Sequence, residues 1–304
     1  SGIERRRIAP PGVHTSALAT AAARQALDAA GLPATAIDFI VVATVTGDHP
    51  VPATAALVQH ALGARCPGVD LNAACAGFLF ALAFARGQIA CGAARHVLVI
   101  GAEVTSRFVD PNDRGVMPLF GDGAGAVVLS AASEAEPGLL ALRLGGDGAQ
   151  ADVLRIEAGG AAHPASAETL ARGAHTLRME GPRVFRNAVR HLPEAVRAVC
   201  AEIGWSVSDI DWFVPHQANA RILRAVVRRL GLAGERLLCN IAEYGNTSAA
   251  SIPIALDEAA RDGRLKPGQR VVLAALGAGL VWGAAAMRWA APDAGRAVGN
   301  ARHG

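Results

Sequence analysis

The sequence predicts an α/β protein built from two similar halves, and two observations carry this prediction. Segments with helical periodicity alternate with short β-rich runs along the 304 residues, an order that is typical of α/β folds. The order of segments also repeats. In the first half a strand ends near Val45 and a later helix opens at Cys75, and in the second half a strand ends at His216 and a later helix opens at Asn246. The spacing is thirty residues in both cases. Two such halves that face each other would bring residues from both into one site.

The individual elements follow from residue type and periodicity. Runs rich in β-branched residues predict strands at Phe39–Val45, Val97–Gly101, Ala124–Leu129, Trp212–Val214, Val271–Leu276 and Val281–Met287. A further strand-like run ends near Leu71. Helical periodicity predicts helices at Ala17–Ala30, Ala53–Leu62, Gly77–Cys91, Val184–Ile203, Ala220–Leu230 and Ser248–Asp262. Gly31, Gly231 and Gly263 follow three of these helices, in the position where glycine commonly ends a helix.

The chain divides accordingly into a first half over residues 1–144 and a second half over residues 179–290. Residues 145–178 are rich in Gly, Ala and His, and we expect them to form a connecting loop region. Within the first half, Ala102–Leu119 is expected to be an insertion that the second half lacks. Residues 291–304 have no apolar period, so we expect a disordered extension.

Composition excludes several classes of protein. A hydrophobic content of 52% with 18% charged residues suits a large core. The longest apolar stretch, Ala73 to Ala85, is too short for a membrane span, and no secretion signal is recognisable. A net charge of +3 without basic runs between aromatics argues against nucleic-acid binding. Five scattered cysteines are typical of reduced thiols in the cytoplasm, and the histidines have no spacing suited to a metal.

Three polar residues at the predicted element ends are the candidate catalytic set. Cys75 lies at a strand-to-helix turn, where unpaired amides and the helix dipole favour the thiolate over a thiol of ordinary pKa, about 8.5. His216 lies in a Pro-His-Gln-Ala-Asn run, and Asn246 lies in the run Gly-Asn-Thr-Ser. A cysteine with a histidine and an amide is a nucleophile with two hydrogen-bond donors.

Each of these residues also has a purely structural interpretation. Cys75 could be a small buried apolar residue, and His216 a hydrogen-bonded core histidine. Asn246 could cap the next helix, a role compatible with chemistry. Gly121–Gly125 lacks the lysine and the spacing of a phosphate-binding loop, and we expect a tight turn under the site. A structural role alone is expected for the other cysteines, Cys66, Cys91, Cys200 and Cys239.

Six stretches together resemble the β-ketoacyl-acyl-carrier-protein synthase III family of the thiolase superfamily. They are AACAGF (73–78), DPNDRG (110–115), FGDGAGAVVL (120–129), WFVPHQAN ending at Asn219, GNTSAAS (245–251) and GAGLVWG (277–283). Chain-elongating ketosynthases use two histidines and thiolases a second cysteine, so the asparagine of GNTSAAS distinguishes this family. The resemblance implies the five-layered thiolase-like fold, a pseudo-dimer of two βαβαβ halves. Family members carry a strand and a helix before the position of Ser1, so we expect a trimmed or absent upstream part.

The resemblance also implies a reaction. An acyl-CoA primer and malonyl-acyl carrier protein undergo decarboxylative condensation to 3-oxoacyl-acyl carrier protein, which initiates fatty-acid or related synthesis. Cys75 would carry the acyl group while the backbone N–H groups of Cys75 and Ala278 hold the oxyanion. His216 and Asn246 would donate hydrogen bonds to the malonyl thioester. The implied partners are the two substrates and a second copy in a homodimer, with no cofactor, metal, nucleic acid or membrane.

Further residues match family positions outside the catalytic set. Arg114 and Asn219 are expected to bind coenzyme A or the carrier protein's pantetheine arm. Arg221 and Arg224 lie on one helical face and are expected to dock the acidic carrier protein, although a solvated face is the alternative. The expected acyl pocket consists of Val51 from the partner subunit with Phe120, Leu177, Phe185 and Leu276. Val51 is smaller than the aromatic residue common there, which favours a longer or branched acyl group.

Two other functions fit the same fold. A relative from specialised metabolism could transfer an acyl group to a small nucleophile without decarboxylation. The second alternative is a non-catalytic partner subunit of the same fold, and the intact Cys75, His216 and Asn246 argue against it.

Overall fold

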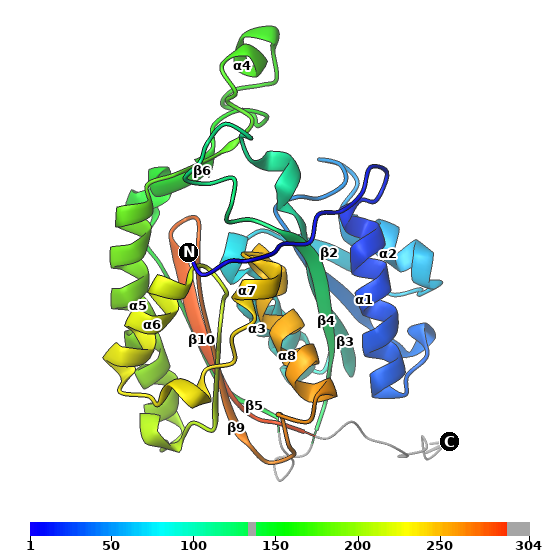
Figure 1. The fold of residues 1–304 in the computed structure, drawn as a ribbon. Coiled ribbons are helices and arrows are strands. Elements are labelled where there is room, and N and C mark those ends of the chain that lie inside the picture. Colours follow the sequence, from blue (N-terminus) through cyan, green and yellow to red (C-terminus); the bar gives the residue numbers. More distant parts are fainter. Residues whose placement is uncertain (133–137, 291–304) are drawn as a thin grey trace.

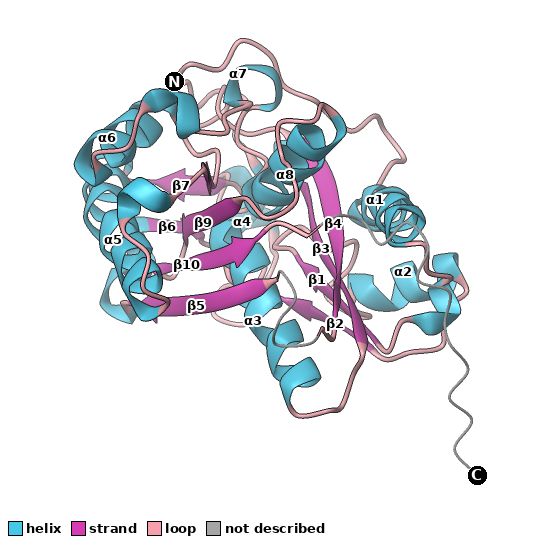
Figure 2. Ribbon diagram, turned by 90° about the horizontal axis from the view of Figure 1, so that it is seen from below, coloured by secondary structure: helices cyan, strands magenta, loops and turns pink. Residues whose placement is uncertain are grey.

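The structure, a computed structural model, describes residues 1–132 and 138–290. Two β-sheets are stacked with a pair of helices between them, and further helices cover both outer faces (Figures 1 and 2). The α/β class and the five-layered arrangement of two similar halves are therefore confirmed.

The two sheets have related topologies. The first has the order β2-β1-β3-β4 and consists of β1 (Phe39–Ala43), β2 (Gly68–Leu71), β3 (His96–Val104) and β4 (Asp122–Ser130). The second has the order β5-β10-β9-β8 and consists of β5 (Leu139–Gly146), β8 (Trp212–Pro215), β9 (Arg270–Gly277) and β10 (Val281–Arg288). In the first sheet the parallel pair β1 and β3 is followed by the antiparallel strand β4. In the second sheet the parallel pair β8 and β9 is followed by the antiparallel strand β10. This shared order explains the repeat in the sequence.

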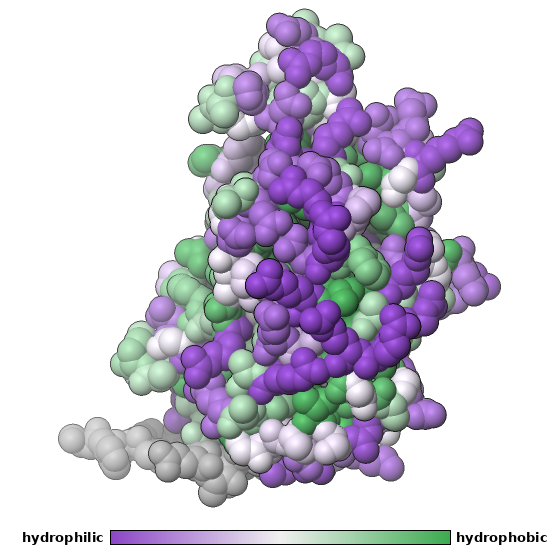
Figure 3. Space-filling model, turned by 90° about the vertical axis from the view of Figure 1, so that its left-hand side faces the viewer, coloured by the Kyte–Doolittle hydropathy of each residue, from purple (hydrophilic) through white to green (hydrophobic). Residues whose placement is uncertain are grey.

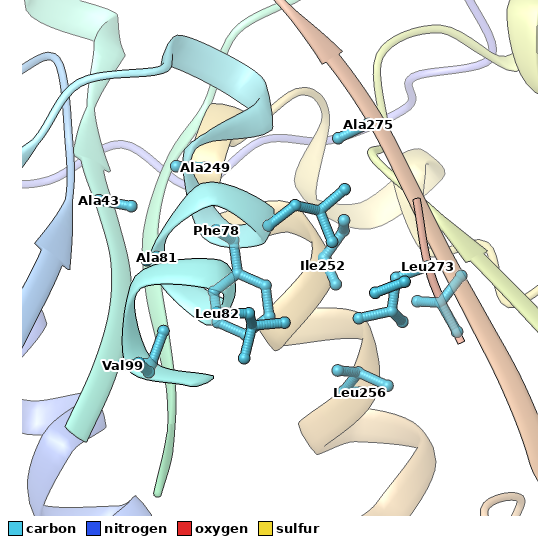
Figure 4. Packing of buried hydrophobic residues seen from close by; sticks show 14 of the residues in the cluster. Ala43, Phe78, Ala81, Leu82, Val99, Ala249, Ile252, Leu256, Leu273 and Ala275 are labelled. Carbon is cyan, nitrogen blue, oxygen red and sulfur yellow. The ribbon is translucent and has the colours of Figure 1, made fainter. Parts of the chain in front are cut away.

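Six helices form the helical layers. These are α1 (Thr15–Ala30) and α2 (Thr54–Leu62) outside the first sheet, α3 (Gly77–Ala90) and α8 (Ser251–Arg261) between the sheets, and α5 (Gly181–Glu202) and α6 (Ala220–Leu230) outside the second. In the central layer, Phe78 and Leu82 of α3 pack beside Ile252 and Leu256 of α8 (Figure 4). The central helix α3 buries apolar residues on several sides because it lies between two sheets. None of the helices in the described ranges is long and apolar enough to cross a membrane.

The predicted division of the chain at residue 144 is wrong. β5 (139–146) pairs with β10 along its length, so it belongs to the second sheet and the boundary falls inside this strand. Residues 145–178 are also more than a connecting loop, since they contain β6 (Leu154–Ile156), α4 (Ala167–Ala171) and the start of β7 (Leu177–Met179). This segment projects from the body of the protein (Figure 1). The predicted extension, 291–304, lies outside the described residues.

The predicted insertion begins later than expected. β3 continues to Val104, and the irregular segment follows it as a short turn, Thr105–Phe108, and a loop that leads to β4. The glycines of Gly121–Gly125 lie largely within β4 and form neither a tight turn nor a phosphate loop. A Cβ atom on Gly125 would lie 2.8 Å from the backbone nitrogen of Ile254, so glycine there lets α8 pack directly on the strand.

The two halves meet at two short 3₁₀ turns that contact each other. The first turn (Ala74–Ala76) precedes α3, and the second turn (Ser248–Ala250) precedes α8. A Cβ atom on Gly101 of β3 would lie 2.3 Å from the carbonyl oxygen of Ala249, closer than any side chain permits. The absence of a side chain at Gly101 therefore allows the second turn to lie against the first sheet.

We predict that Gly101→Ala destabilises the protein by about 1–3 kcal/mol or more, because the added methyl group forces two backbone segments apart. Gly87→Ala is the matched control: nothing lies within 4 Å of a Cβ there, and the residue is inside α3. Alanine should stabilise that position by roughly 0.5–1 kcal/mol. Urea unfolding of both variants measures the effects, and equal stability of Gly101→Ala and wild type would contradict the close approach.

Candidate active site

Cys75, His216 and Asn246 converge where the two turns meet. Ser248 touches all three, because its side chain lies beside the Cys75 thiol, its backbone lies beside His216, and its N–H donates to Asn246 Oδ1 at 2.9 Å. The three candidate residues are 8%, 5% and 6% exposed, respectively. The site thus combines one thiol from the first half with two polar groups from the second, and all three are almost entirely shielded from water.

Cys75 lies in the first turn, directly before α3, as the sequence predicted. The residue before it, Ala74, has a φ of 46°, in the left-handed region that residues with a side chain rarely adopt. The expectation of a lowered thiol pKa is wrong for the unliganded site. Burial raises the pKa of Cys75 to about 11 and outweighs the favourable contact with Ser248, while the carboxylate of Glu103 acts in the same direction as burial. The resting residue is a neutral thiol.

His216 follows β8 at the edge of the second sheet, and its ring is held on one side. Nδ1 lies 2.6 Å from the hydroxyl oxygen of Ser251. Burial lowers the pKa of His216 to about 4, so the imidazole is neutral at physiological pH. The backbone of Ser248 is a second hydrogen-bond partner of the imidazole, and it opposes the effect of burial on the pKa without overcoming it.

Asn246 is held in place by hydrogen bonds of its own backbone N–H and C=O groups. Its N–H donates to Leu119 O at 2.8 Å, and its carbonyl accepts from Gly121 N at 2.9 Å. The side-chain oxygen accepts the N–H of Ser248, which fixes the amide so that the NH₂ group faces away from that turn. The local turn-forming role and a role as donor are compatible, because they use different atoms of the same amide.

A buried carboxylate next to these residues was missed by the sequence analysis. Glu103 is 0% exposed and accepts hydrogen bonds from Thr46 Oγ1 at 2.6 Å and from Ser248 Oγ at 3.0 Å. Thr44 Oγ1 and the N–H of Val45 donate to the same carboxylate. Burial nevertheless raises the pKa of Glu103 to about 7. The signal was present in the sequence, as an acidic residue inside the apolar run of β3.

The backbone near Cys75 offers a site for an oxyanion. The end of β9 lies against the first turn, since a Cβ atom on Gly277 would be 2.8 Å from the nitrogen of Cys75. In the described part of the chain, no backbone acceptor engages the N–H of Cys75 or of Ala278. Ala278 does not have a positive φ, so a side chain is tolerated there.

The predicted binding residues lie on α6 and on the loop before β4. Asn219 caps α6 by accepting the N–H of Arg221 at 2.8 Å. Arg221 and Arg224 are exposed, and neither forms an ion pair with a described residue. Hydrophilic side chains dominate the face of the molecule on which α5 and α6 lie (Figure 3). Arg114 is exposed on the loop between β3 and β4.

The predicted acyl-pocket residues come from four separate parts of the chain. Phe120 is 3% exposed and bridges to Asn246, and Leu276 is buried near the end of β9. Leu177 lies on β7, and Phe185 lies partly exposed on α5. Val51 is 84% exposed in the single chain, away from any buried cluster. The N-terminal segment fixes Phe120, because Arg6 donates to its carbonyl oxygen at 2.9 Å.

Family models match two parts of the chain. The model described as 3-oxoacyl-[acyl-carrier-protein (ACP)] synthase III matches residues 69–148, and the model for the C terminal of the same family matches residues 200–289. Cys75 lies in the first of these matches, and His216 and Asn246 lie in the second.

Curated relatives and solved structures give the same result. The β-ketoacyl-[acyl-carrier-protein] synthase III of Rhizorhabdus wittichii is 49% identical over 95% of this chain and 88% of the relative. The structure of 3-oxoacyl-(acyl carrier protein) synthase III from Pseudomonas aeruginosa has a TM-score of 0.86 at 44% identity, covering 94% of this chain and 86% of that chain. The priming β-ketosynthase from the R1128 polyketide biosynthetic pathway has a TM-score of 0.85 at 36% identity, covering 94% and 85%.

The raised pKa of Glu103 predicts a specific pH dependence of stability. Between the unfolded value, about 4.3, and the folded value the native state holds one proton more than the unfolded state, so stability falls as pH rises. From pH 5 to 6.5 this group should contribute a loss of about 2 kcal/mol in the free energy of unfolding. Glu103→Gln should remove that loss while keeping the shape of the side chain. Urea unfolding of both proteins at several pH values isolates the effect, and a constant difference between them would contradict it.

Proposed function

The chain belongs to the 3-oxoacyl-[acyl-carrier-protein] synthase III family, and from that premise we propose how the Cys75 site works. The protein catalyses the condensation of an acyl-CoA with malonyl-acyl carrier protein to give a 3-oxoacyl product. The observation that carries the proposed mechanism is that neutral His216 and Asn246 both contact Ser248, whose side chain lies beside the Cys75 thiol.

The first step is transfer of the acyl group to Cys75. The sulfur attacks the thioester carbonyl of the acyl-CoA, a new C–S bond forms, and coenzyme A leaves as the free thiol with the proton that Cys75 gives up. Because burial keeps the resting thiol neutral, removal of this proton is coupled to substrate binding and attack. The oxyanion that forms is held by the N–H groups of Cys75 and Ala278, which have no protein partner of their own among the described residues.

The second step is decarboxylation of the malonyl thioester. His216 Nε2 and the Asn246 amide donate hydrogen bonds to the thioester carbonyl, so the electron pair left by departing carbon dioxide is stabilised as an enolate. Neutral donors suit this step, because a full positive charge beside the malonyl carboxylate would stabilise the ground state as well. The carbanion then attacks the acyl-cysteine, the new C–C bond forms, and the Cys75 thiolate leaves.

The reaction needs no cofactor beyond the pantetheine arms of its two substrates. Its place is at the start of fatty-acid synthesis or of a related pathway, since it joins a primer to the first malonyl unit. The R1128 priming ketosynthase is related in fold and sequence and acts in a polyketide pathway. Release of carbon dioxide separates this reaction from acyl transfer to a small nucleophile without decarboxylation.

The acyl carrier protein docks on the exposed face of α6. This helix begins at Ala220, four residues after His216, so its first turns border the site that the pantetheine arm must reach. Arg221 and Arg224 form no ion pair with a described residue, so both present positive charge at this position. The acyl carrier protein is acidic, and opposite charges favour its association there. Arg114 and Asn219 contact the phosphates or the pantetheine arm, for which a guanidinium and an amide are suitable donors.

The protein acts as a cytoplasmic homodimer. The edge strand β2 and Val51 expose apolar side chains in the single chain, which a second copy would cover. In such a dimer Val51 completes the acyl pocket that Phe120, Leu177, Phe185 and Leu276 form, and its small size admits a longer or branched acyl group. A light-scattering mass of one chain in solution would contradict this assembly.

We predict that the two half-reactions separate by variant. Cys75→Ser forms no acyl-enzyme with an acyl-CoA, because the hydroxyl is a poorer nucleophile and no base stands ready to activate it. His216→Ala and Asn246→Ala still acylate, but each loses malonyl decarboxylation by on the order of a hundredfold. Intact-mass analysis measures the acyl adduct and carbon dioxide release measures the second step. A His216→Ala or Asn246→Ala enzyme that condenses at the wild-type rate but fails to acylate would overturn the assignment.

We also predict that Arg221→Glu with Arg224→Glu weakens the use of malonyl-acyl carrier protein far more than the use of acyl-CoA. Charges at the rim of an interface mainly set the association rate and are screened over about 10 Å at moderate salt. The wild-type rate with carrier protein should fall as ionic strength rises, and the double variant should show a flatter dependence. Arg24→Glu with Arg65→Glu is the matched control, since both arginines are exposed near α2. Equal loss with both substrates would refute docking at α6.

A further inference from the structure

The N-terminal segment, from Ser1 to Arg7, crosses from the second half of the protein to the first (Figure 1). At its start, Ser1 O accepts the N–H of Ala220, the first residue of α6, at 2.9 Å. At its end, Arg7 O accepts the N–H of Asp122, the first residue of β4, at 2.8 Å. Backbone hydrogen bonds therefore hold the segment to both halves, and Arg6 lies between these attachments.

Of three consecutive arginines in this segment, Arg6 alone turns into the protein. Arg5 and Arg7 both reach the surface carboxylate of Glu243, at 3.3 Å and 3.6 Å. Arg6 is half-buried and forms no ion pair with a described residue. Its stem lies over Gly245, where a Cβ atom would be 3.0 Å from Arg6 Cγ. Arg6 is therefore packed against the residue that directly precedes the asparagine of the active site.

The guanidinium of Arg6 donates to backbone carbonyl groups in the loop before β4. Nη1 donates to Phe120 O at 2.9 Å and also to Met117 O, and Nη2 lies 3.7 Å from Met117 Sδ. The loop from Met117 to Phe120 belongs to no helix or strand, so its shape depends on contacts of this kind. A guanidinium suits this task, because its N–H donors lie in one fixed plane.

A single peptide unit connects Arg6 to Asn246. The unit between Phe120 and Gly121 accepts from Arg6 at its carbonyl oxygen, and its N–H donates to Asn246 O at 2.9 Å. The neighbouring carbonyl, that of Leu119, accepts the N–H of Asn246 at 2.8 Å. Because a peptide unit is planar and rigid, its C=O cannot turn away from Arg6 without turning its N–H away from Asn246. The hydrogen bond at the C=O also polarises the unit and strengthens its N–H as a donor.

We propose that Arg6 is a positioning residue for Asn246, because it fixes the peptide unit to which the backbone of Asn246 is bonded. The inference rests on the proposed function of Asn246 as a donor to the malonyl thioester. Cys75 lies in the other turn, and the donors proposed for its acyl group are backbone N–H groups that Arg6 does not contact. Loss of the Arg6 guanidinium therefore impairs decarboxylation more than acyl transfer.

The kinetic test follows the two half-reactions separately, with one acyl-CoA that acylates the wild type. Arg6→Met removes the donors and keeps a long stem, so acylation of Cys75, measured by intact mass, should stay close to the wild-type rate. Carbon dioxide release from malonyl-acyl carrier protein by the acylated enzyme should fall roughly ten- to hundredfold, because a displacement of about 1 Å can cost a hundredfold in rate. Arg6→Lys keeps a charged donor and should recover part of this loss.

A double-variant cycle tests whether Arg6 acts through Asn246. In the Asn246→Ala background no amide remains to be positioned, so Arg6→Met should cause no further loss of carbon dioxide release. An effect that Arg6 exerted through Phe120 and the acyl pocket, or through general stability, would persist in that background. Arg5→Met is the matched control, since it removes the neighbouring guanidinium, which pairs with Glu243 at the surface. It should leave both half-reactions unchanged.

Each outcome decides the proposal. Unchanged carbon dioxide release in Arg6→Met, an equal loss in the wild-type and Asn246→Ala backgrounds, or an equal loss in Arg5→Met would overturn the role of Arg6. If circular dichroism shows that Arg6→Met is unfolded, Arg6→Lys replaces it in the same cycle and is interpreted in the same way.

Failure of the wild-type enzyme to release carbon dioxide from malonyl-acyl carrier protein would instead refute the proposed function. The positioning role is then decided by a crystal structure of the folded Arg6 variant. The expected result is a turned Phe120–Gly121 peptide unit and a displaced Asn246 side chain. A peptide unit and an amide that both keep their wild-type positions would overturn the proposal.

Discussion

The close contact of the two short turns is the constraint on which the site depends. Each turn comes from a different half, and each contains a residue with side chain and positive φ, Ala74 and Ser248. Gly101 permits the contact by leaving room for the carbonyl oxygen of Ala249, and Gly277 does the same for the backbone around Cys75. The hydrogen bond from Ser248 to Glu103 links the second turn to the first sheet. Without this contact Cys75 would lie on a different surface from His216 and Asn246.

Burial of this junction sets its electrostatics. The same loss of water raises the pKa values of Cys75 and Glu103 and lowers that of His216, so the groups at the junction tend toward their neutral forms. Hydrogen bonds are stronger in such surroundings than in water, and fixed donors need little reorganisation when charge develops on a substrate. The site is therefore suited to stabilising an enolate with an imidazole and an amide, neither of which carries a net charge.

The sequence predicted much of this arrangement, and its failures have physical causes. The helix α6 was predicted to the residue, because its periodicity is strong and Asn219 and Gly231 cap it. β5 was missed, since Leu139–Gly146 pairs with β10 across a long stretch of sequence that local pattern cannot reveal. The thiol pKa was misjudged because a helix terminus is visible in sequence but burial is not. Glu103 was missed for the same reason, as its importance comes only from the residues that surround it.

A crystal structure of the enzyme acylated at Cys75 would show which groups hold the acyl carbonyl. We propose that backbone amides serve the acyl group and that side-chain donors serve the malonyl group. The acyl carbonyl oxygen should therefore lie about 3 Å from the N–H groups of Cys75 and Ala278, and it should not contact the side chains of His216 and Asn246. An acyl oxygen bonded to His216 or Asn246 would refute this division.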